Sequence, residues 1–446
     1  MALTGLDIYK LLPKTNCKEC GFATCLAFAM ALAQKKTSLD KCPHVSAAAR
    51  DALESASQPP IKLVTIGTGT NKIEIGNETV MYRHEQKFYH PTAIGFLLED
   101  TLPQPELEKR VDAMNALQFE RVGQIIKPDL ICIKNSSGSK DKFMKALQVV
   151  FSKSRLNIAL LASDSQMLKD ALTLLKSKRP LLICEGAGCL DGSIQLAKDN
   201  NVPLAITCRT LEEAADSTDK ARKAGVEEIV INLAEGKLTS RVQNFTYARR
   251  AALKKNFRPL GFPLMAFTGA LSKELELAEA LSYVAKYAGI VIVSDHSPEF
   301  VFPLLVARQD IYADPQKPVQ VEPKVYEIGK VDKNSPVLIT TNFSITYFTV
   351  AGEVESSKVP AYIICCDAEG MSVLTAWAAE KFTAEKIVET FKKVGIENIV
   401  SHKKITIPGY VAVMSSKLED ALSGWEISVG PREASGLTNY LRNWKS

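Results

Sequence analysis

Four cysteines near the N-terminus have the residue type and the spacing of a metal-binding site. The pattern is C-x2-C-x4-C-x16-C, formed by Cys17, Cys20, Cys25 and Cys42. Four thiolates bind either Zn²⁺ or a [4Fe-4S] cluster. Pro43 follows the last cysteine, as in ferredoxin-type motifs, and the uneven gaps differ from the paired C-x2-C knuckles of structural zinc sites. We therefore favour an iron-sulfur cluster; zinc and four unligated thiols are the alternatives, and His44 is expected to be a surface or capping residue.

Short helices are expected to position these cysteines. Residues 5–12 are predicted to form an amphipathic helix that ends before Pro13, and a second helix is predicted over residues 25–35. A third helix over residues 47–55 leads into a linker at residues 57–60. Because so small a module buries little apolar surface, a bound metal must contribute to its folding.

The composition indicates a soluble protein with several folded units. The chain has 446 residues, 46% hydrophobic and 24% charged, with a net charge of +5. No basic stripe with interleaved aromatic residues is present, so nucleic acid is not an expected partner. The N-terminus lacks a signal-peptide pattern, and no apolar run approaches the ~20 residues that span a bilayer. We expect a cytoplasmic protein without membrane contact, whose ten cysteines serve thiolate chemistry rather than disulfides.

The middle of the chain alternates between strand-like and helix-like segments. Apolar runs at residues 62–66, 73–75 and 79–83 predict a small antiparallel β element. Eight runs rich in Ile, Leu and Val then predict strands at residues 93–98, 130–134, 157–162, 181–185, 203–208, 228–233, 263–268 and 289–294. Helical periodicity between them predicts helices that include 105–126, 141–152, 165–175 and 211–224. This order favours a closed (β/α)8 barrel; an open doubly wound sheet is the alternative.

A barrel places its chemistry at the carboxyl ends of its strands. Among the polar residues expected there, the segment Glu185 to Cys189 and the pair Asp295-His296 are the most suggestive. Capping of the following helices, or bonding of loop backbone, is the favoured explanation for these residues. No convincing acid/base constellation follows from the sequence.

The last third of the chain reads as a further α/β unit. Residues 313–333 are proline-rich and are expected to be a connection. Strands are predicted at residues 337–341, 361–367, 404–408, 410–414 and 426–429, with helices between them. Three predicted strand ends, 340–346, 370–375 and 430–436, are rich in Gly, Ser and Thr, which either bind a cofactor at helix N-termini or simply cap helices. Cys365 and Cys366 are expected in the core.

The motif T-N-C-K-E-C-G-F-A-T-C with Cys42-Pro43, the barrel-like middle and the turn E-G-M-S-V-L-T-A-W resemble the large (gamma) subunits of corrinoid iron-sulfur proteins. This family belongs to the acetyl-CoA synthase/decarbonylase systems of acetogens and methanogens, and the resemblance covers essentially the whole chain. It implies an α/β protein with three parts: a [4Fe-4S] cluster domain at residues 1–58, a TIM-like barrel with an N-terminal β element at 59–325, and a Rossmann-like corrinoid-binding domain at 326–446.

The resemblance implies a methyl carrier that acts within methyltransferase reactions. A bound cobamide would accept a methyl group as Co(I) from methyltetrahydrofolate through a methyltransferase and would donate it from methyl-Co(III) to acetyl-CoA synthase. The cluster would return inactive Co(II) to Co(I), which suits the low potentials of all-thiolate clusters. The implied partners are a homologous small subunit in a heterodimer, the methyltransferase, acetyl-CoA synthase/CO dehydrogenase, and a reductive activator or ferredoxin.

The same resemblance assigns site residues. The four cysteines would be the cluster ligands. The implied corrinoid contacts are Thr340, Asn342, Thr346, Gly370, Met371, Ser372, Val373, Leu374, Thr375 and Ala434. The Asp-x-His-x-x-Gly signature of base-off cobalamin domains is absent, which fits a family in which no protein histidine ligates cobalt. The resemblance also implies that the cobamide binds base-off and that the barrel is a docking scaffold.

Two other functions remain compatible with the residues alone. A pterin-dependent barrel methyltransferase with an electron-entry cluster would use polar groups at strand ends, such as Asn135, Asp164 and Asn232. A ferredoxin-like electron carrier would use the cluster alone, with the other domains docking its partners.

Overall fold

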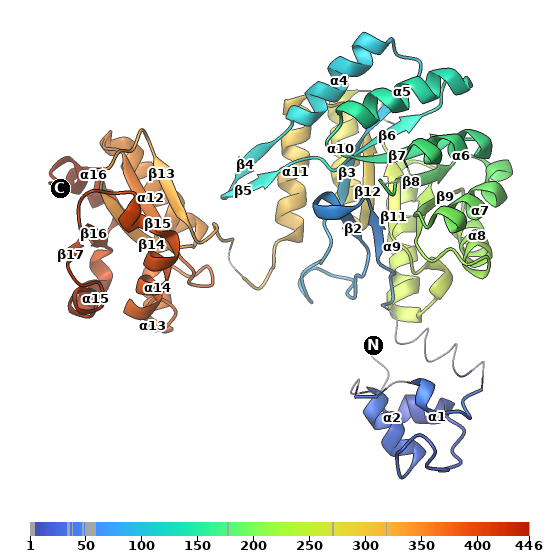
Figure 1. Ribbon diagram of the computed structural model, residues 1–446, viewed down its shortest axis with the longest axis horizontal. Coiled ribbons are helices and arrows are strands. Elements are labelled where there is room, and N and C mark those ends of the chain that lie inside the picture. The colour runs from blue at the N-terminus through green and yellow to red at the C-terminus, as the bar shows by residue number, and fades with distance from the viewer. Residues whose placement is uncertain are drawn as a thin grey trace. The chain divides into compact units, whose positions relative to one another are not determined.

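The computed structural model describes residues 5–33, 36–37, 39–46, 49, 59–175, 178–269, 272–317 and 319–445. The chain forms two compact units (Figure 1). One unit comprises Met1–Leu117 and Lys127–Tyr312, and the other comprises Gln118–Ile126 and Ala313–Ser446. The division into three domains at residues 58 and 325 stays a prediction. Among the described residues, no helix has both the length and the apolar character needed to cross a membrane.

The N-terminal segment begins with the two short helices that the sequence predicts. Helix α1 spans Gly5–Leu11 and α2 spans Cys25–Ala33, followed by the 3-10 helix η1 at Leu39–Lys41. Ile8 and Leu12 pack against Phe28 and Ala29 in a small apolar core. Of the predicted helix at residues 47–55 only Ala49 is described, and it is helical; the rest of that segment and the start of the following linker lie outside the described residues.

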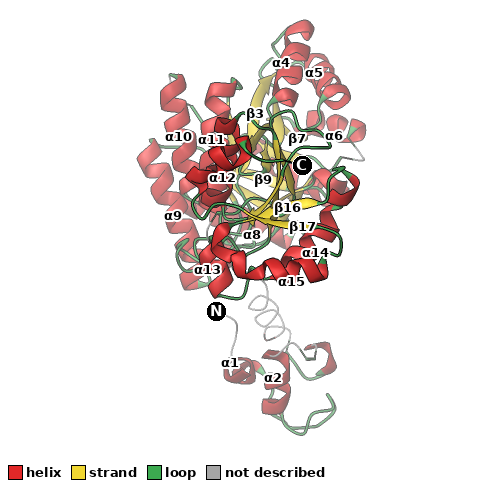
Figure 2. Ribbon diagram, turned by 90° about the vertical axis from the view of Figure 1, so that its left-hand side faces the viewer, coloured by secondary structure: helices red, strands yellow, loops and turns green. Residues whose placement is uncertain are grey.

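Eight parallel strands close into a barrel, as the sequence predicts. They are β3 (Ala93–Glu99), β6 (Leu130–Lys134), β7 (Asn157–Ala162), β8 (Leu181–Cys184), β9 (Leu204–Cys208), β10 (Ile229–Leu233), β11 (Leu264–Phe267) and β12 (Ala288–Val293). Their order around the barrel is β10-β11-β12-β3-β6-β7-β8-β9. The alternative of an open sheet is therefore wrong, and the helices form an outer layer around the strands (Figure 2).

One helix follows each barrel strand. These helices are α4 (Gln104–Ala116), α5 (Lys140–Lys153), α6 (Ser165–Leu174), α7 (Leu190–Asn200), α8 (Leu211–Lys223), α9 (Leu238–Lys255), α10 (Lys273–Ala285) and α11 (Pro298–Tyr312). Side chains of Ser139, Asp164, Thr210 and Ser272 cap the N-termini of α5, α6, α8 and α10 by accepting a backbone N–H. Each cap satisfies an N–H that lacks a partner within its helix.

The predicted helix over residues 105–126 is wrong in its second half. Helix α4 ends at Ala116, and a hairpin of β4 (Phe119–Arg121) and β5 (Gln124–Ile126) follows. Val122 and Gly123 form its turn with φ of 56° and 71°, a conformation that a β-branched residue rarely adopts. Val122 is buried in the same apolar cluster as Tyr326 of the second unit. This long-range packing overrides the local helical pattern.

The small antiparallel β element before the barrel is only partly as predicted. Strands β1 (Val64–Ile66) and β2 (Ile73–Ile75) pair antiparallel. The predicted third run at residues 79–83 is not a strand, so that prediction is wrong. The Glu85 carboxylate accepts the backbone N–H groups of Met81 and Tyr82 at 3.2 Å, which gives them a turn instead of a ladder.

The second unit contains a mostly parallel five-stranded sheet with the order β13-β15-β14-β16-β17. The parallel strands are β14 (Val337–Thr341), β15 (Ala361–Cys366), β16 (Lys404–Ile407) and β17 (Glu426–Val429). The connecting and terminal helices are α12 (Ser344–Ser357), α13 (Val373–Ala378), α14 (Ala384–Val394), α15 (Ser415–Ala421) and α16 (Leu437–Arg442). The part of this unit from Ala313 onward is coloured orange to red in Figure 1. Cys365 and Cys366 are fully buried core residues, as expected.

Two sequence predictions for this unit are wrong. Residues 313–333 are more than a connection, because β13 (Val325–Ile328) pairs antiparallel with β15 at the sheet edge. The strand predicted at residues 410–414 is the 3-10 helix η6 (Gly409–Met414). An added Cβ at Gly409 would lie 2.6 Å from the Gly430 carbonyl oxygen, so the chain turns there against the neighbouring strand end.

Candidate cluster-binding module and cofactor pocket

The cysteine loop runs irregularly from Pro13 to Thr24 and presents its sulfur atoms in different environments. Cys25, the first residue of α2, and Cys42, just after η1, are buried, whereas Cys20 is half-buried and Cys17 is exposed. Three of the four, Cys20, Cys25 and Cys42, belong to the apolar cluster of the module. The structure thus gathers three predicted ligands at one core and leaves the fourth at its surface.

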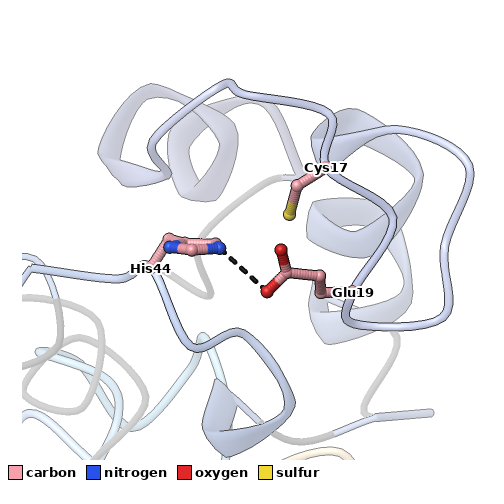
Figure 3. Close-up of side chains that lie close together, drawn as sticks. All are labelled: Cys17, Glu19 and His44. Carbon is pink, nitrogen blue, oxygen red and sulfur yellow. Dashed lines mark hydrogen bonds and ion pairs between the residues drawn. The ribbon is translucent and has the colours of Figure 1, made fainter.

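The exposed cysteine lies beside an ion pair. The His44 Nε2 and Glu19 Oε2 atoms are 2.9 Å apart, and Cys17 lies next to them (Figure 3). Among the described residues, these three alone place ligand atoms of three His, Cys, Asp or Glu residues within 4.8 Å of one another. His44 is exposed, as the sequence analysis expects.

The donor set and the loop conformation fit an iron-sulfur cluster. The Asn16 backbone N–H donates to Cys25 Sγ at 3.4 Å, a bond of the kind that tunes cluster thiolates, and the Asn16 side-chain oxygen accepts the Cys25 N–H at 2.8 Å. The loop also contains left-handed residues, including Lys18 and Gly21 at φ of 68° and 84°. Gly21 has open space where a Cβ would stand. A tetrahedral zinc site has a different requirement. With Zn–S bonds of about 2.3 Å, all four sulfurs would have to lie about 3.8 Å from one another.

A pocket lies at the carboxyl ends of β14, β16 and β17. Its volume is about 380 Å³. Strand β15 lies on one side of β14 and β16 lies on the other, so the strand order reverses at β14. Ligands of open α/β sheets bind at such switch points. The pocket therefore lies where this topology places a cofactor.

Six of the ten implied corrinoid contacts line this pocket. They are Thr340, Thr346, Ser372, Val373, Leu374 and Ala434. Thr340 comes from the end of β14, Thr346 from the first turn of α12, and Ala434 from the loop after β17. The three Gly-, Ser- and Thr-rich strand ends of the sequence therefore do converge on one site.

The other four implied contacts, Asn342, Gly370, Met371 and Thr375, are not among the pocket-lining residues. The buried Asn342 side chain accepts the N–H groups of Ala368 and Gly370 and donates to Asp367. It therefore holds the turn before Ser372 in place. Met371 packs against the core of the unit, and Thr375 Oγ1 lies 2.9 Å from Ser372 Oγ.

Six further lining residues lie inside the strand ends that the sequence predicts but were not named singly: Phe343, Ile345, Gly430, Pro431, Arg432 and Glu433. Sequence reasoning missed the remaining nine, which are Leu338, Ile339, Thr349, Val350, Thr406, Ile407, Pro408, Tyr410 and Leu437. Phe343 and Ile345 lie inside a segment that the sequence analysis singled out, so its apolar residues were the available signal. The sequence pattern predicts that Tyr410 lies in a strand. In the structure its hydroxyl donates to the Glu433 carboxylate at the rim of the pocket.

The pocket has a mainly apolar lining with a few polar groups. Most of its lining is aliphatic or aromatic, and Ile345 and Leu374 are 66% and 48% exposed. Thr340 is buried, and among the described residues its Oγ1 has no hydrogen-bond partner. The neighbouring Thr341 shares this property outside the pocket, so the Thr340 hydroxyl is available to a ligand without by itself indicating one.

The polar residues at the carboxyl end of the barrel are engaged with one another. The buried Asp100 carboxylate accepts from Asn135 Nδ2 at 2.6 Å and from Ser137 N and Oγ at 2.8 and 2.7 Å. Asp164 caps α6, and Asn232 Nδ2 donates to Thr207 Oγ1 at 3.1 Å. These bonds hold loops and helix ends, whereas Asn232 Oδ1 is buried and has no hydrogen-bond partner among the described residues.

The pair Asp295-His296 also has a structural explanation. Asp295 Oδ1 accepts the Ser297 N–H at 2.7 Å just before α11. Burial lowers the pKa of His296, and Arg110 lowers it further. His296 is therefore neutral at pH 7 and packs edge-on against Phe96.

Two protein-family profiles match the sequence of this chain. The sequence profile of the family "CO dehydrogenase/acetyl-CoA synthase delta subunit" matches residues 63–441, and the profile "Putative Fe-S cluster" matches residues 12–44. The second match contains all four cysteines of the module. The chain belongs to the CO dehydrogenase/acetyl-CoA synthase delta subunit family.

Individual relatives narrow this assignment. The "Corrinoid/iron-sulfur protein large subunit" of Moorella thermoacetica is 46% identical over 442 residues, which is 99% of each chain. The "Acetyl-CoA decarbonylase/synthase complex subunit gamma" of Methanothermobacter thermautotrophicus is 37% identical over 456 residues, also 99% of each. Among solved structures, dihydropteroate synthase of Coxiella burnetii is 12% identical with a TM-score of 0.39, covering 56% of this chain and 100% of that one.

Proposed function

We propose that this chain is the large subunit of a corrinoid iron-sulfur protein and acts as a methyl carrier. The observation that carries the proposal is the pocket at the switch point of the second unit, with its apolar lining and the unpaired Thr340 hydroxyl. Whole-length identity to relatives that carry this name supports it. A barrel methyltransferase or a simple electron carrier would not need the cofactor pocket of the second unit.

The C-terminal unit would be the Rossmann-like corrinoid-binding domain. When bound, a cobamide supplies the reduced cobalt that takes up and passes on a methyl group, and a [4Fe-4S] cluster supplies the electron that restores its reduced state. Thr340 would donate to a polar group of the cobamide, while Thr346, Val373, Leu374 and Ala434 would contact its macrocycle. Ser372 would hold the start of α13 at the rim.

The cobamide would bind base-off, and among the described residues the pocket lining offers no histidine to replace its own base as a cobalt ligand. The protein therefore supplies no imidazole ligand to cobalt from this lining, which favours the low-coordinate reduced state. Asn342, Gly370, Met371 and Thr375 would act behind the lining by shaping the turn.

The cysteine module would hold the cluster through Cys17, Cys20, Cys25 and Cys42. Cys25 and Cys42 are buried, so they would fix the cluster in the module core. Cys17 is exposed, so it would lie on the side that faces an electron donor. The donor would be a reductive activator or ferredoxin.

The remaining partners follow from the same proposal. A small subunit would complete a heterodimer, a methyltetrahydrofolate methyltransferase would supply the methyl group, and acetyl-CoA synthase/CO dehydrogenase would receive it. The barrel would serve as the docking scaffold, and the complex would be cytoplasmic.

A single-turnover methyl transfer tests this function. The reduced complex with its small subunit is mixed with the methyltransferase and labelled methyltetrahydrofolate, and then with acetyl-CoA synthase. We expect about one label per chain to move onto the complex and then to leave it. Label that never becomes bound to the complex would contradict the carrier role.

The Thr340 hydroxyl gives a prediction with opposite effects on stability and on binding. In the corrinoid-free chain, Thr340→Val should raise the free energy of unfolding by about 1 kcal/mol, because a buried unsatisfied hydroxyl is removed. Cobamide affinity should fall roughly two- to tenfold through the lost hydrogen bond. Denaturant unfolding and spectroscopic titration measure the two quantities.

Thr341 offers a matched control for this prediction. Its Oγ1 is likewise buried without a partner, but it does not line the pocket. Thr341→Val should therefore stabilise the chain and leave cobamide affinity unchanged. Equal losses of affinity in both variants would contradict a direct contact from Thr340.

A further inference from the structure

The hairpin of β4 and β5 adds two chain crossings between the compact units. It follows the barrel helix α4 in sequence, yet residues Gln118–Ile126 belong to the second unit. The chain therefore passes from one unit to the other after Leu117, after Ile126 and after Tyr312. The second unit is thus attached to the barrel through the hairpin as well as through the segment that follows α11.

The turn of the hairpin is held closely by the second unit. Val122 is 8% exposed and belongs to the same apolar cluster as Tyr326 and Tyr347. A Cβ at Gly123 would lie 2.4 Å from Tyr326 Oη, so the backbone approaches this ring at a distance that a larger residue would prevent. By contrast, Ile125 is 54% exposed. We call the buried turn and the two tyrosines the hairpin seat.

The hairpin depends on this seat for its own stability. Strands β4 and β5 form a separate two-stranded sheet with three residues in each strand. A single two-stranded hairpin is at best marginally stable in water. Amide exchange in residues 118–126 therefore reports whether the hairpin is seated.

The apolar cluster beneath the seat also reaches the cofactor pocket. Leu338 and Leu437 are buried members of this cluster, and both line the pocket. Val350 and Ala434 pack against the cluster and line the pocket as well. Close-packed interiors contain few voids, so a change at one side of a cluster is felt at the other. The hairpin and the pocket therefore share one set of packed side chains.

We propose that the hairpin of β4 and β5 is a strap that responds to occupation of the pocket. This inference rests on the proposed cobamide site. A cobamide that packs against Leu338, Val350 and Leu437 stabilises the cluster and with it the seated hairpin, so the loaded second unit is held at both attachments. Without the cofactor the hairpin leaves its seat more often, and the attachment through it becomes longer and looser. Because such coupling is reciprocal, release of the hairpin lowers cobamide affinity.

Hydrogen exchange of the complete complex, with and without bound hydroxocobalamin, tests the proposal. We expect amides of residues 118–126 to exchange about tenfold more slowly in the loaded complex, whereas amides of the barrel strand β7 should exchange alike in both. Equal exchange of residues 118–126 in complexes whose absorbance shows different corrinoid content would overturn the strap alone. Failure of the complex to bind any corrinoid would instead contradict the proposed function.

Two matched substitutions in the hairpin test the reciprocal effect. Val122→Asp places a carboxylate in the apolar seat, and Asp adopts the φ of 56° at this position more readily than Val, so backbone strain does not explain a loss. Its residues 118–126 should exchange about tenfold faster, and its affinity for hydroxocobalamin should fall about three- to tenfold. Ile125→Asp makes a similar change at an exposed position and should alter neither quantity. Full affinity of Val122→Asp with a released hairpin would overturn the coupling.

A milder variant keeps the test usable if Val122→Asp does not fold. Gly123→Ala places a methyl group against Tyr326 Oη and should release the hairpin with a smaller loss of affinity. Tyr326→Phe in the same chain removes that oxygen and should restore part of the slow exchange and part of the affinity. Exchange and affinity that change independently across these variants would contradict the strap.

Discussion

Replacing Cys20 by Ala is expected to abolish reductive reactivation of the cobalt while methylation of chemically pre-reduced complex continues at the normal rate. The substitution removes one of four proposed cluster ligands. Cys20 is half-buried, whereas Cys25 and Cys42 lie deep in the module core, so Cys20 is the ligand whose loss disturbs packing least among the three. Reactivation by a physiological reductant should fall at least about 100-fold, because a cluster with a missing thiolate is not held in its four-cysteine form.

Two assays measured on the same preparation decide this prediction. Cobalt reduction is followed by its visible absorbance, and methylation is followed after reduction by a strong chemical reductant. Cys208→Ala, which removes a buried barrel thiol, serves as the control and should retain both activities. Equal loss of both activities in Cys20→Ala would contradict a role confined to electron transfer.

Replacing Thr346 by Trp is expected to empty the complex of cobamide. Thr346 is half-buried in the first turn of α12 and lines the pocket. An indole there would occupy space next to Thr340 and Val350 that the cobamide needs. The bound cobalt per chain should fall at least about tenfold, and methyl transfer should fall with it, while the cluster absorbance remains.

The same helix provides a control of equal bulk. Ser356 is exposed near the end of α12 and is not among the pocket-lining residues. Ser356→Trp should change the free energy of unfolding by no more than about 0.5 kcal/mol and should retain full cobamide content. Normal cobalt content in Thr346→Trp would show that the cobamide binds elsewhere.

The barrel could be predicted from the sequence because its signal is local and repeated. Runs such as residues 130–134 and 157–162 are short and mostly apolar, and they coincide with β6 and β7. Strands of a parallel barrel are buried on both faces, so nearly every residue in them is apolar. The hairpin of β4 and β5 could not be predicted this way, since Val122 is held in a left-handed turn by packing against residues two hundred positions away.

The pocket was predictable only at the level of its three loops. Gly, Ser and Thr at strand ends indicate where helices begin, and these loops meet at the site. Which side chains face the pocket depends on the sheet order, which the sequence does not state. Asn342 illustrates the difference: its residue type suits a ligand contact, yet its amide is committed to the turn at Ala368 and Gly370.

The cysteine pattern was the clearest signal in the sequence. Its spacing alone located a module that a separate family profile also matches at residues 12–44.

The most direct test of the account is the visible spectrum of the complex purified without oxygen together with its small subunit. We predict corrinoid bands and broad iron-sulfur absorbance in the same preparation, with about one cobamide and one [4Fe-4S] cluster per large subunit. Absence of corrinoid bands would contradict the methyl-carrier function, and absence of cluster absorbance would contradict the role of the four cysteines.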